Sequence, residues 1–499
     1  MIYLNYITNQ MNDKKFFYTC LFISFIYIFP LIISDIYYLD DLGRVIYGTM
    51  WNHDARYLSN IIYYILTFGN QTINISPYPQ IFSIIVLSFS FLFITKIFKL
   101  EKNLISVFCC ILILTSPFYI ENLSYKFDSL TMSLSLFFCI YSVYFSSIYS
   151  NHKGYIIPIL LLLCTLYTYE PSIGVFITLS IGLFLCDAFL NNKYNLSVKL
   201  LFKNVFIIIT SLFLWKIISY LPGFYIRSTI LSSSKIFEIL IWKINIFIDT
   251  FDALFSYRYL ISIILLIILS ICCFLYYYVK FIYKNKIKDN IFITLFVLFS
   301  IPIIIIMSQG VSFFSLRKTD LFGFAPRVFI GYGVTTLVIS IFIIKSKIHN
   351  SIKFTLFFLP FMYSLTLIST YSNASKSQLR ILNLVSANLS QDIEKYKLKV
   401  IPMIVNGKMQ NSNELNHSGK NNPILFNLVQ TPLREQRSWG YRQLIALYNI
   451  PVIYPSENKI YIGKTELCKS KKISSNIFYD LFISQKNDLY IVDFNKKCS

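Results

Sequence analysis

Long apolar runs separated by short polar connections occupy most of the chain between residues 1 and 370. A helix rises about 1.5 Å per residue, so a run of roughly 20 apolar residues is long enough to cross the hydrocarbon core of a bilayer. The pattern predicts about eleven membrane-spanning helices and therefore an α-helical polytopic membrane protein. We expect these helices at residues 16–34, 78–98, 104–120, 128–149, 155–169, 172–190, 204–221, 258–279, 290–308, 326–345 and 352–370.

The connection after the first run, residues 35–77, contains an amphipathic pattern. Leu58, Ile61 and Ile65 fall on one face of a helix, whereas Ser59 falls on another. A helix of this kind is typical of segments that lie in the plane of the membrane interface. We therefore predict a first outer connection with an interfacial helix.

The pattern changes near residue 371, where residues 371–499 are predicted to form a separate domain after the transmembrane domain of residues 1–370. Apolar positions recur at helical spacing near 375–396, and short alternating runs follow. Helices that alternate with strands predict a small α/β domain. We expect a strand at 398–405, a polar loop at 406–422, a helix within 434–448, and strands near 451–454, 459–462 and 488–494.

The composition supports a membrane protein, because 56 % of the residues are hydrophobic and 18 % are aromatic. The net charge of +21 might suggest a nucleic-acid partner, but Lys and Arg concentrate in alternate connections. This distribution matches the positive-inside rule, and it places the N-terminus in the cytoplasm and the C-terminal domain outside. The charge therefore indicates orientation, and no nucleic acid is expected.

The cysteines agree with this orientation. All except Cys468 and Cys498 lie in or beside apolar runs, where a thiol behaves as a small apolar group. Cys468 and Cys498 lie in the tail that is predicted to be outside, and an oxidising compartment would allow them to pair. We predict a disulfide bond between them, with two free thiols as the alternative.

The first outer connection also carries the densest group of chemically capable residues in the chain. Asp40 and Asp41 are adjacent, Arg44 follows one turn later, and Trp51 and Arg56 come shortly after. Charges close to the membrane are costly unless they serve a purpose. This density makes the connection the leading candidate for an active site.

Other outer connections contribute further polar side chains. The second connection holds Glu121, Tyr125, Lys126 and Asp128, and the third holds Glu170. If the helices form one bundle, these side chains converge on one cavity, and we expect the carboxylates and Tyr125, with Trp51 and Arg56, to contact substrate. The basic residues expected to bind a phosphate are Arg44, Lys126, Arg317, Lys318 and Arg327.

Each of these residues also has an ordinary structural explanation, which the sequence leaves open. Asp40 and Asp41 can begin a solvated loop or cap a helix, Glu170 can cap a helix end, Lys126 and Asp128 can pair only with each other, Arg327 can anchor a helix at the interface, and Trp51 can belong to an aromatic belt.

The combination suits sugar transfer from a lipid phosphate. A carboxylate, Asp40 or Asp41, would accept a proton from the attacking hydroxyl, and cations would stabilise the leaving phosphate. The four histidines are scattered without metal-ligand spacing, so no zinc site is expected. Binding of Mg²⁺ or Mn²⁺ between an aspartate and the phosphate stays open.

Four motifs resemble the type II family of O-antigen glucosyltransferases, the serotype-converting membrane enzymes of bacteria and their phages. They are YYLDDLGRVIYG at 37–48, ENLSYKFDSLTM at 121–132, APRVFIGYG at 325–333 and YSNASKSQ at 371–378. The resemblance implies a C-type glycosyltransferase fold in the bacterial inner membrane, with the catalytic base at Asp40 or Asp41. It also implies an undecaprenyl-phosphate-linked glucose donor, a lipid-linked O-antigen acceptor on the periplasmic face, and a functional link to a lipid-sugar flippase and a cytoplasmic lipid-sugar synthase.

Two other functions remain alternatives. A flippase or transporter of lipid-linked saccharides would carry charges midway in its spans and paired halves, whereas only Lys216 lies well inside a run. An O-antigen polymerase would be expected to have a large central outer loop in place of a terminal domain. Both fit the sequence less well than a polyprenyl-phosphate-sugar-dependent hexosyltransferase does.

Overall fold

The computed structural model describes residues 7–221, 223, 229–230, 236–285, 291–310, 315–316, 325–395, 401–435, 448–450, 452–453, 467–486 and 488–496. The chain divides into two compact units. Unit 1 comprises Met1–Ile32, Met50–Asn70 and Ile75–Ile368, and unit 2 comprises Ile33–Thr49, Gln71–Asn74 and Ser369–Ser499.

The described residues of unit 1 are helical or irregular apart from one pair of two-residue strands, β1 and β2. Its elements are α2 (Asp13–Ser34, which ends in unit 2), η1 (Asn52–Asp54), α4 (Tyr57–Thr67), α5 (Tyr78–Ile97), α6 (Leu104–Ile111), α7 (Tyr119–Ser124), α8 (Ser129–Ile148), α9 (Lys153–Leu166), η2 (Glu170–Ser172), α10 (Ile173–Phe189), α11 (Tyr194–Ile218), β1 (Thr229–Ile230), α12 (Ile236–Leu254), α13 (Tyr257–Asn285), α14 (Ile291–Met307), β2 (Ser315–Leu316), η5 (Pro326–Phe329), α15 (Tyr332–Lys345) and the first part of α16 (Asn350–Lys395).

Within the described residues, eight helices are long and apolar enough to cross a membrane. They are α2, α5, α8, α10 with the preceding η2, α11, α13, α15 with the preceding η5, and α16. The α-helical polytopic membrane fold is therefore confirmed, but the predicted number of about eleven spans is not.

The difference comes from three shorter segments. The run at 104–120 is divided between α6 and α7, while α9 has 14 residues and α14 has 17. Pro117 lies in the gap between α6 and α7, and a proline disfavours helical geometry at the residue before it. The apolar run therefore continues in sequence while the helix does not.

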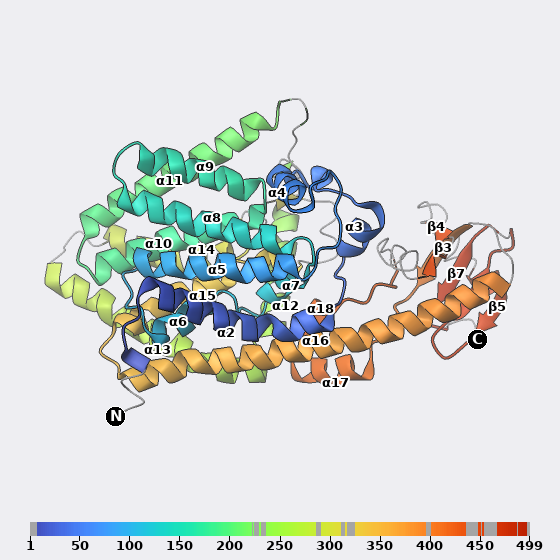
Figure 1. Ribbon diagram of the computed structural model, residues 1–499. Helices are drawn as coiled ribbons and strands as arrows, with labels where there is room; N and C mark the ends of the chain where they lie inside the picture. Colours follow the sequence, from blue (N-terminus) through green and yellow to red (C-terminus); the bar gives the residue numbers. More distant parts are fainter. Residues whose placement is uncertain are drawn as a thin grey trace. The chain divides into compact units, whose positions relative to one another are not determined.

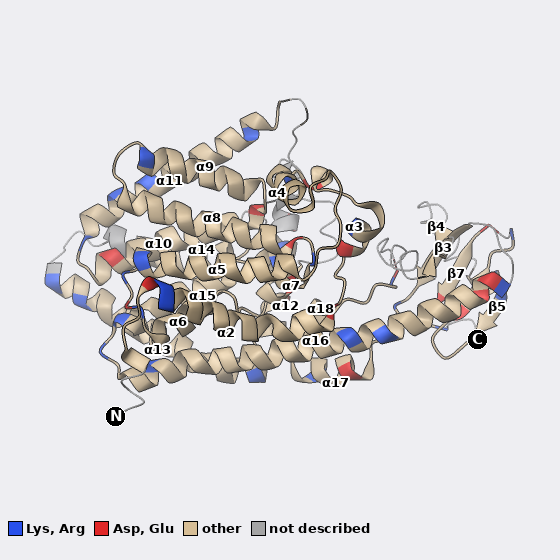
Figure 2. Cartoon of the chain, viewed as in Figure 1, with Lys and Arg blue, Asp and Glu red and all other residues tan. Residues whose placement is uncertain are grey.

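The helices of unit 1 pack closely. Helix α8 lies between α5 and α9, and α10 packs against α11 and α15 (Figure 1). At Gly333 in α15, an added Cβ would lie 2.7 Å from the Cα of Ile113, which follows α6. Small residues of this kind allow helices in a membrane to approach each other. The helices α5, α8 and α10 are free of charge along most of their length (Figure 2).

The predicted amphipathic helix is present as α4. Its polar side packs inward, because Ser59 and Tyr63 are buried, whereas Ile61 and Ile65 are exposed. An exposed apolar face and a buried polar face are the reverse of a soluble surface helix, and they fit a helix whose outer side meets lipid.

Unit 2 is built on a five-stranded sheet of order β4-β3-β7-β6-β5. Strands β4, β3 and β7 are parallel, and β7, β6 and β5 are antiparallel. Its elements are α3 (Asp41–Tyr47), the last part of α16, β3 (Ile401–Asn406), α17 (Asn413–Asn421), α18 (Leu425–Leu428), β4 (Val452–Ile453), η6 (Leu467–Lys469), β5 (Lys471–Ser475), β6 (Asp480–Ile483) and β7 (Tyr490–Asp493).

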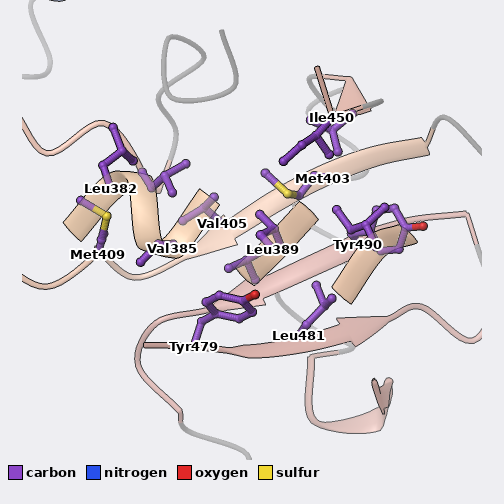
Figure 3. Packing of buried hydrophobic residues seen from close by; sticks show 14 of the residues in the cluster. Leu382, Val385, Leu389, Met403, Val405, Met409, Ile450, Tyr479, Leu481 and Tyr490 are labelled. Carbon is purple, nitrogen blue, oxygen red and sulfur yellow. The ribbon is translucent and has the colours of Figure 1, made fainter. Parts of the chain in front are cut away.

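The core of unit 2 forms where α16 packs on the sheet (Figure 3). Leu382, Val385 and Leu389 of α16 lie against Met403 of β3 and Tyr490 of β7, and all five are buried. The apolar helix face predicted near 375–396 is therefore confirmed. The two helices expected at 352–370 and near 375–396 are a single helix, because α16 runs without interruption through 46 residues.

Two further sequence predictions for this region need correction. The polar loop expected at 406–422 contains helix α17, which starts because the Ser412 side chain accepts a hydrogen bond from the Leu415 backbone N–H. Strands β5 and β6 were not predicted. The strands at 398–405 and 488–494 correspond to β3 and β7, whereas most of the helix within 434–448 and the strand at 459–462 lie outside the described residues.

Candidate active site

Glu121 and Arg327 form a buried ion pair between segments far apart in sequence. Glu121 lies on α7 and is fully buried, and its Oε1 lies 3.0 Å from Nη1 of Arg327 on η5. Its other oxygen, Oε2, accepts a hydrogen bond of 2.7 Å from the Arg327 backbone N–H. One carboxylate therefore fixes both the main chain and the side chain of Arg327.

Neighbouring side chains complete this arrangement. Tyr125 lies beneath the Arg327 guanidinium, 5.3 Å from its Cζ to the ring centre, and its hydroxyl accepts a hydrogen bond from Nη1. The Arg327 carbonyl accepts hydrogen bonds from Asn122 Nδ2 at 3.3 Å and from the Tyr169 hydroxyl at 3.1 Å. The position of Arg327 is thus set by two separate stretches of chain, residues 121–125 and Tyr169.

A second ion pair joins Asp128 to Arg56. Asp128 precedes α8 and is buried, and its Oδ1 accepts hydrogen bonds from Trp51 Nε1 at 2.5 Å and from Arg56 Nη1 at 3.0 Å. The Trp51 ring is itself buried against Tyr63 and Phe127. The indole therefore holds the carboxylate in place while the carboxylate orients the arginine.

Tyr169 connects the two pairs. The Arg56 guanidinium lies over its ring at 4.9 Å, and the Tyr169 hydroxyl donates to the Arg327 carbonyl. Burial raises the pKa of Tyr169 to about 12, so it stays protonated as a donor. Burial lowers the pKa of Arg56, but Asp54 and Asp128 outweigh this effect and raise the pKa above its ordinary value.

We call this group the arginine cluster. Its members are Trp51, Arg56, Glu121, Tyr125, Asp128, Tyr169 and Arg327. The side chains of Glu121 and Asp128 are 1 % and 2 % exposed, whereas those of Arg327 and Arg56 are 25 % and 16 % exposed. The acids thus hold the arginines from the buried side, and both arginine side chains are partly exposed.

The Asp40–Arg44 stretch belongs to unit 2. Asp41 starts α3, is completely buried, and accepts a hydrogen bond of 3.0 Å from the Tyr38 backbone N–H through Oδ2. Arg44 is also buried and donates from Nη1 to the Thr49 carbonyl at 3.1 Å. Asp40 is exposed at the N-cap position, where its side chain makes no cap hydrogen bond within the described residues, so helix capping does not explain it.

The structure therefore brings together six of the predicted site residues, namely Trp51, Arg56, Glu121, Tyr125, Asp128 and Arg327. Lys126, which follows Tyr125 in the sequence, is buried, and Glu170 is half-buried at the start of η2. Convergence of Asp40, Asp41 and Arg44 with this cluster stays a prediction.

Three other predicted residues need separate mention. Arg317 and Lys318 lie outside the described residues, as does Cys498. Cys468 is disulfide-bonded, and the eight cysteines of the membrane region are free thiols. The pairing of Cys468 with Cys498 stays a prediction.

Sequence reasoning missed Tyr169 and Asn122. Tyr169 lies directly before Glu170, but tyrosine is common at membrane interfaces and gave no separate signal. No group of three or more His, Cys, Asp or Glu side chains that could hold a metal occurs in the part of the chain that is described. Binding of Mg²⁺ or Mn²⁺ by fewer carboxylates stays open.

The part of the chain that the structure describes has eight long apolar helices and buried ion pairs in the connections, which define an integral-membrane protein with a charged polar site. The sequence model of the glucosyl transferase GtrII family matches residues 29–338, and the chain belongs to this family. The matched region contains the complete arginine cluster together with Asp40, Asp41 and Arg44.

One relative supports the same relationship. The "Uncharacterized 55.3 kDa protein in gtrB 5'region" of Salmonella phage P22 is 32 % identical over 185 residues. The match spans 37 % of this chain and 38 % of the phage protein. No solved structure matches the chain.

Proposed function

We propose that this protein transfers glucose from an undecaprenyl-phosphate donor to a lipid-linked O-antigen acceptor at the periplasmic face of the bacterial inner membrane. The observation that carries the proposal is membership of the GtrII glucosyl transferase family, since the matched residues include every candidate side chain of the first three connections. The eight apolar helices support a substrate that is itself anchored in lipid.

In this proposal the arginine cluster binds the phosphate of the donor. A guanidinium group stays charged and presents several N–H donors in a plane that matches phosphate oxygens. Arg56 and Arg327 are each oriented by a buried carboxylate while part of the side chain is exposed. They therefore need little rearrangement to stabilise negative charge on a leaving phosphate.

Asp41 or Asp40 acts as the general base. Its carboxylate accepts the proton of the acceptor hydroxyl, whose oxygen forms a bond to the anomeric carbon of glucose. The bond between that carbon and the phosphate oxygen breaks, and its electron pair leaves on the phosphate. Asp41 is buried and fixed by a backbone N–H, which supports it as the more ordered of the two.

The donor has to be made and brought to the outer face, so we propose a cytoplasmic lipid-sugar synthase and a lipid-sugar flippase as functional partners. The name of the phage P22 relative places it in the 5' region of gtrB, which supports a genetic link of this kind. The predicted outer location of the C-terminal domain supports an acceptor on the same side.

The test is transfer of labelled glucose from synthetic undecaprenyl-phosphate glucose to lipid-linked O-antigen in vesicles. We expect Asp41→Asn or Asp40→Asn to reduce transfer by at least about 100-fold, the contribution typical of general base catalysis. Tyr47→Phe, on the exposed side of α3, serves as the control. Wild-type activity in both aspartate variants would refute the assigned base, and movement of labelled lipid-sugar without transfer would favour a flippase.

A further inference from the structure

Tyr169 is the member of the arginine cluster to which the proposed chemistry gives no role of its own. It is 1 % exposed, so it presents almost no surface to a substrate. Its backbone N–H donates to the Thr165 carbonyl at 2.8 Å, and its extended backbone precedes η2. The main chain of Tyr169 therefore belongs to the connection between α9 and α10, whereas the two arginines lie on other connections.

The side chain of Tyr169 contacts both arginines, each through a different part. The guanidinium carbon of Arg56 lies 4.9 Å from the ring centre, which is within the range of cation–π attraction. The Tyr169 hydroxyl donates to the Arg327 carbonyl at 3.1 Å. The ring thus supports one arginine, and the hydroxyl holds the segment that carries the other.

Arg56 has hydrogen-bond donors that the described residues do not use. Its Nη1 donates to Asp128, whereas its Nε and Nη2 make no hydrogen bond with any residue that the structure describes. The Arg56 side chain is 16 % exposed. Donors without a protein partner on a partly exposed arginine indicate an anionic ligand, because charged donors bond most strongly to anions.

The two arginines also repel each other. The positive charge of Arg327 opposes the protonated form of Arg56, and each guanidinium is paired with only one buried acid. Tyr169 presents the negative face of its ring to Arg56 and a hydrogen bond to the Arg327 segment, so it helps to keep two cations in one group. An anion that bonds both guanidinium groups would relieve their repulsion.

We propose that Tyr169 is a positioning residue that makes Arg56 and Arg327 act as one binding unit for the donor phosphate. The proposal rests on the proposed function for the identity of the phosphate. The ring of Tyr169 orients the side of Arg56 that has unused donors, and the hydroxyl fixes the Arg327 segment beside it. Tyr169 acts through the two arginines and does not itself bind the phosphate.

The test measures binding of farnesyl phosphate, and of the neutral alcohol farnesol, to the full-length protein in lipid nanodiscs by calorimetry, with empty nanodiscs as the blank. We expect the wild type to bind the phosphate more tightly than the alcohol. Tyr169→Phe keeps the ring and should weaken phosphate binding by only about threefold, because Asn122 Nδ2 still donates to the Arg327 carbonyl. Tyr169→Leu also removes the ring and should weaken binding by about tenfold to thirtyfold.

A double-variant cycle with Arg56 separates positioning from a general loss of structure. The difference in affinity between Tyr169→Phe and Tyr169→Leu measures the contribution of the ring. In an Arg56→Gln background the ring has no guanidinium to orient, so this difference should fall below about twofold. A ring that only supports the fold would cause the same loss in both backgrounds.

Tyr119 on α7 provides matched controls. It is also 1 % exposed, and its hydroxyl shares a hydrogen bond of 2.8 Å with the Ser133 hydroxyl, but among the described residues it contacts neither arginine through its ring or its hydroxyl. Tyr119→Phe and Tyr119→Leu should therefore leave the affinity for farnesyl phosphate unchanged, although the leucine variant should melt at a lower temperature. If Tyr169→Leu does not fold, Tyr169→Met, with a flexible side chain that fills gaps, serves the same comparison.

Three results would overturn the proposal: the wild type does not distinguish farnesyl phosphate from farnesol, the variant without the Tyr169 ring binds the phosphate as tightly as the wild type, or the ring contribution is as large in the Arg56→Gln background. The glucose-transfer assay separates failure of this inference from failure of the proposed function. Phosphate binding that depends on Tyr169 without any glucose transfer would refute only the proposed reaction. Transfer at the wild-type rate in Tyr169→Leu would refute only the positioning role.

Discussion

Replacing Arg327 by alanine should destabilise unit 1 far more than replacing its partner Glu121 by glutamine. Arg327→Ala leaves a carboxylate that is only 1 % exposed without its guanidinium partner. At the observed separation of 3.0 Å, the attraction is about 5 kcal/mol for an effective dielectric constant near 20. Because a quarter of the Arg327 side chain is exposed, solvent weakens this attraction. We therefore expect Arg327→Ala to lower the free energy of unfolding by about 3 kcal/mol.

Glu121→Gln has a smaller expected cost. The glutamine keeps an oxygen that can accept the Arg327 backbone N–H, and the arginine that remains charged can reach water. We expect a loss of about 1 kcal/mol, the net value of one hydrogen bond. In the double variant the isolated buried charge is absent, so the two effects should differ from additivity by about 1–3 kcal/mol.

The measurement is the free energy of unfolding in mixed detergent micelles for the wild type, both single variants and the double variant. Lys153→Ala, at the exposed start of α9, is the control and should change stability by less than about 0.5 kcal/mol. The reasoning fails if Arg327→Ala is no more destabilising than Glu121→Gln, or if the two effects simply add.

Two further predictions test packing and electrostatics. Gly333→Ala should cost about 1–3 kcal/mol in unfolding free energy, because its Cβ would lie 2.7 Å from the Cα of Ile113, whereas Gly69→Ala, with its nearest atom at 3.8 Å, should not. In unit 2, burial raises the pKa of Asp480, but hydrogen bonds from Ser475 and Lys472 outweigh it and lower the pKa below its ordinary value. The stabilisation is therefore complete above the ordinary pKa of 3.8 and is lost as the pH falls through the lowered folded-state pKa. Asp480→Asn should remove this part of the acid dependence of unfolding, and an unchanged profile would contradict the assignment.

The site was partly predictable from residue type and position. Charged residues are rare in this chain, so acids and arginines beside apolar runs were conspicuous. Six members of the arginine cluster were predicted in this way, either as charged residues or as aromatic neighbours of charged residues. The pairing was not predictable. Asp128 binds Arg56 across 72 positions and Glu121 binds Arg327 across 206, and nothing in either local sequence specifies its partner.

Hydropathy by itself determined the membrane class and most of the long helices, because the cost of placing polar groups in lipid acts on each run separately. Tertiary packing decided where the run at 104–120 divides between α6 and α7, and that α16 extends from the membrane region into the sheet domain. It also decided that Tyr169 joins two ion pairs. These features depend on atoms brought together from distant parts of the chain, and the energy of such contacts does not exist until the chain has folded.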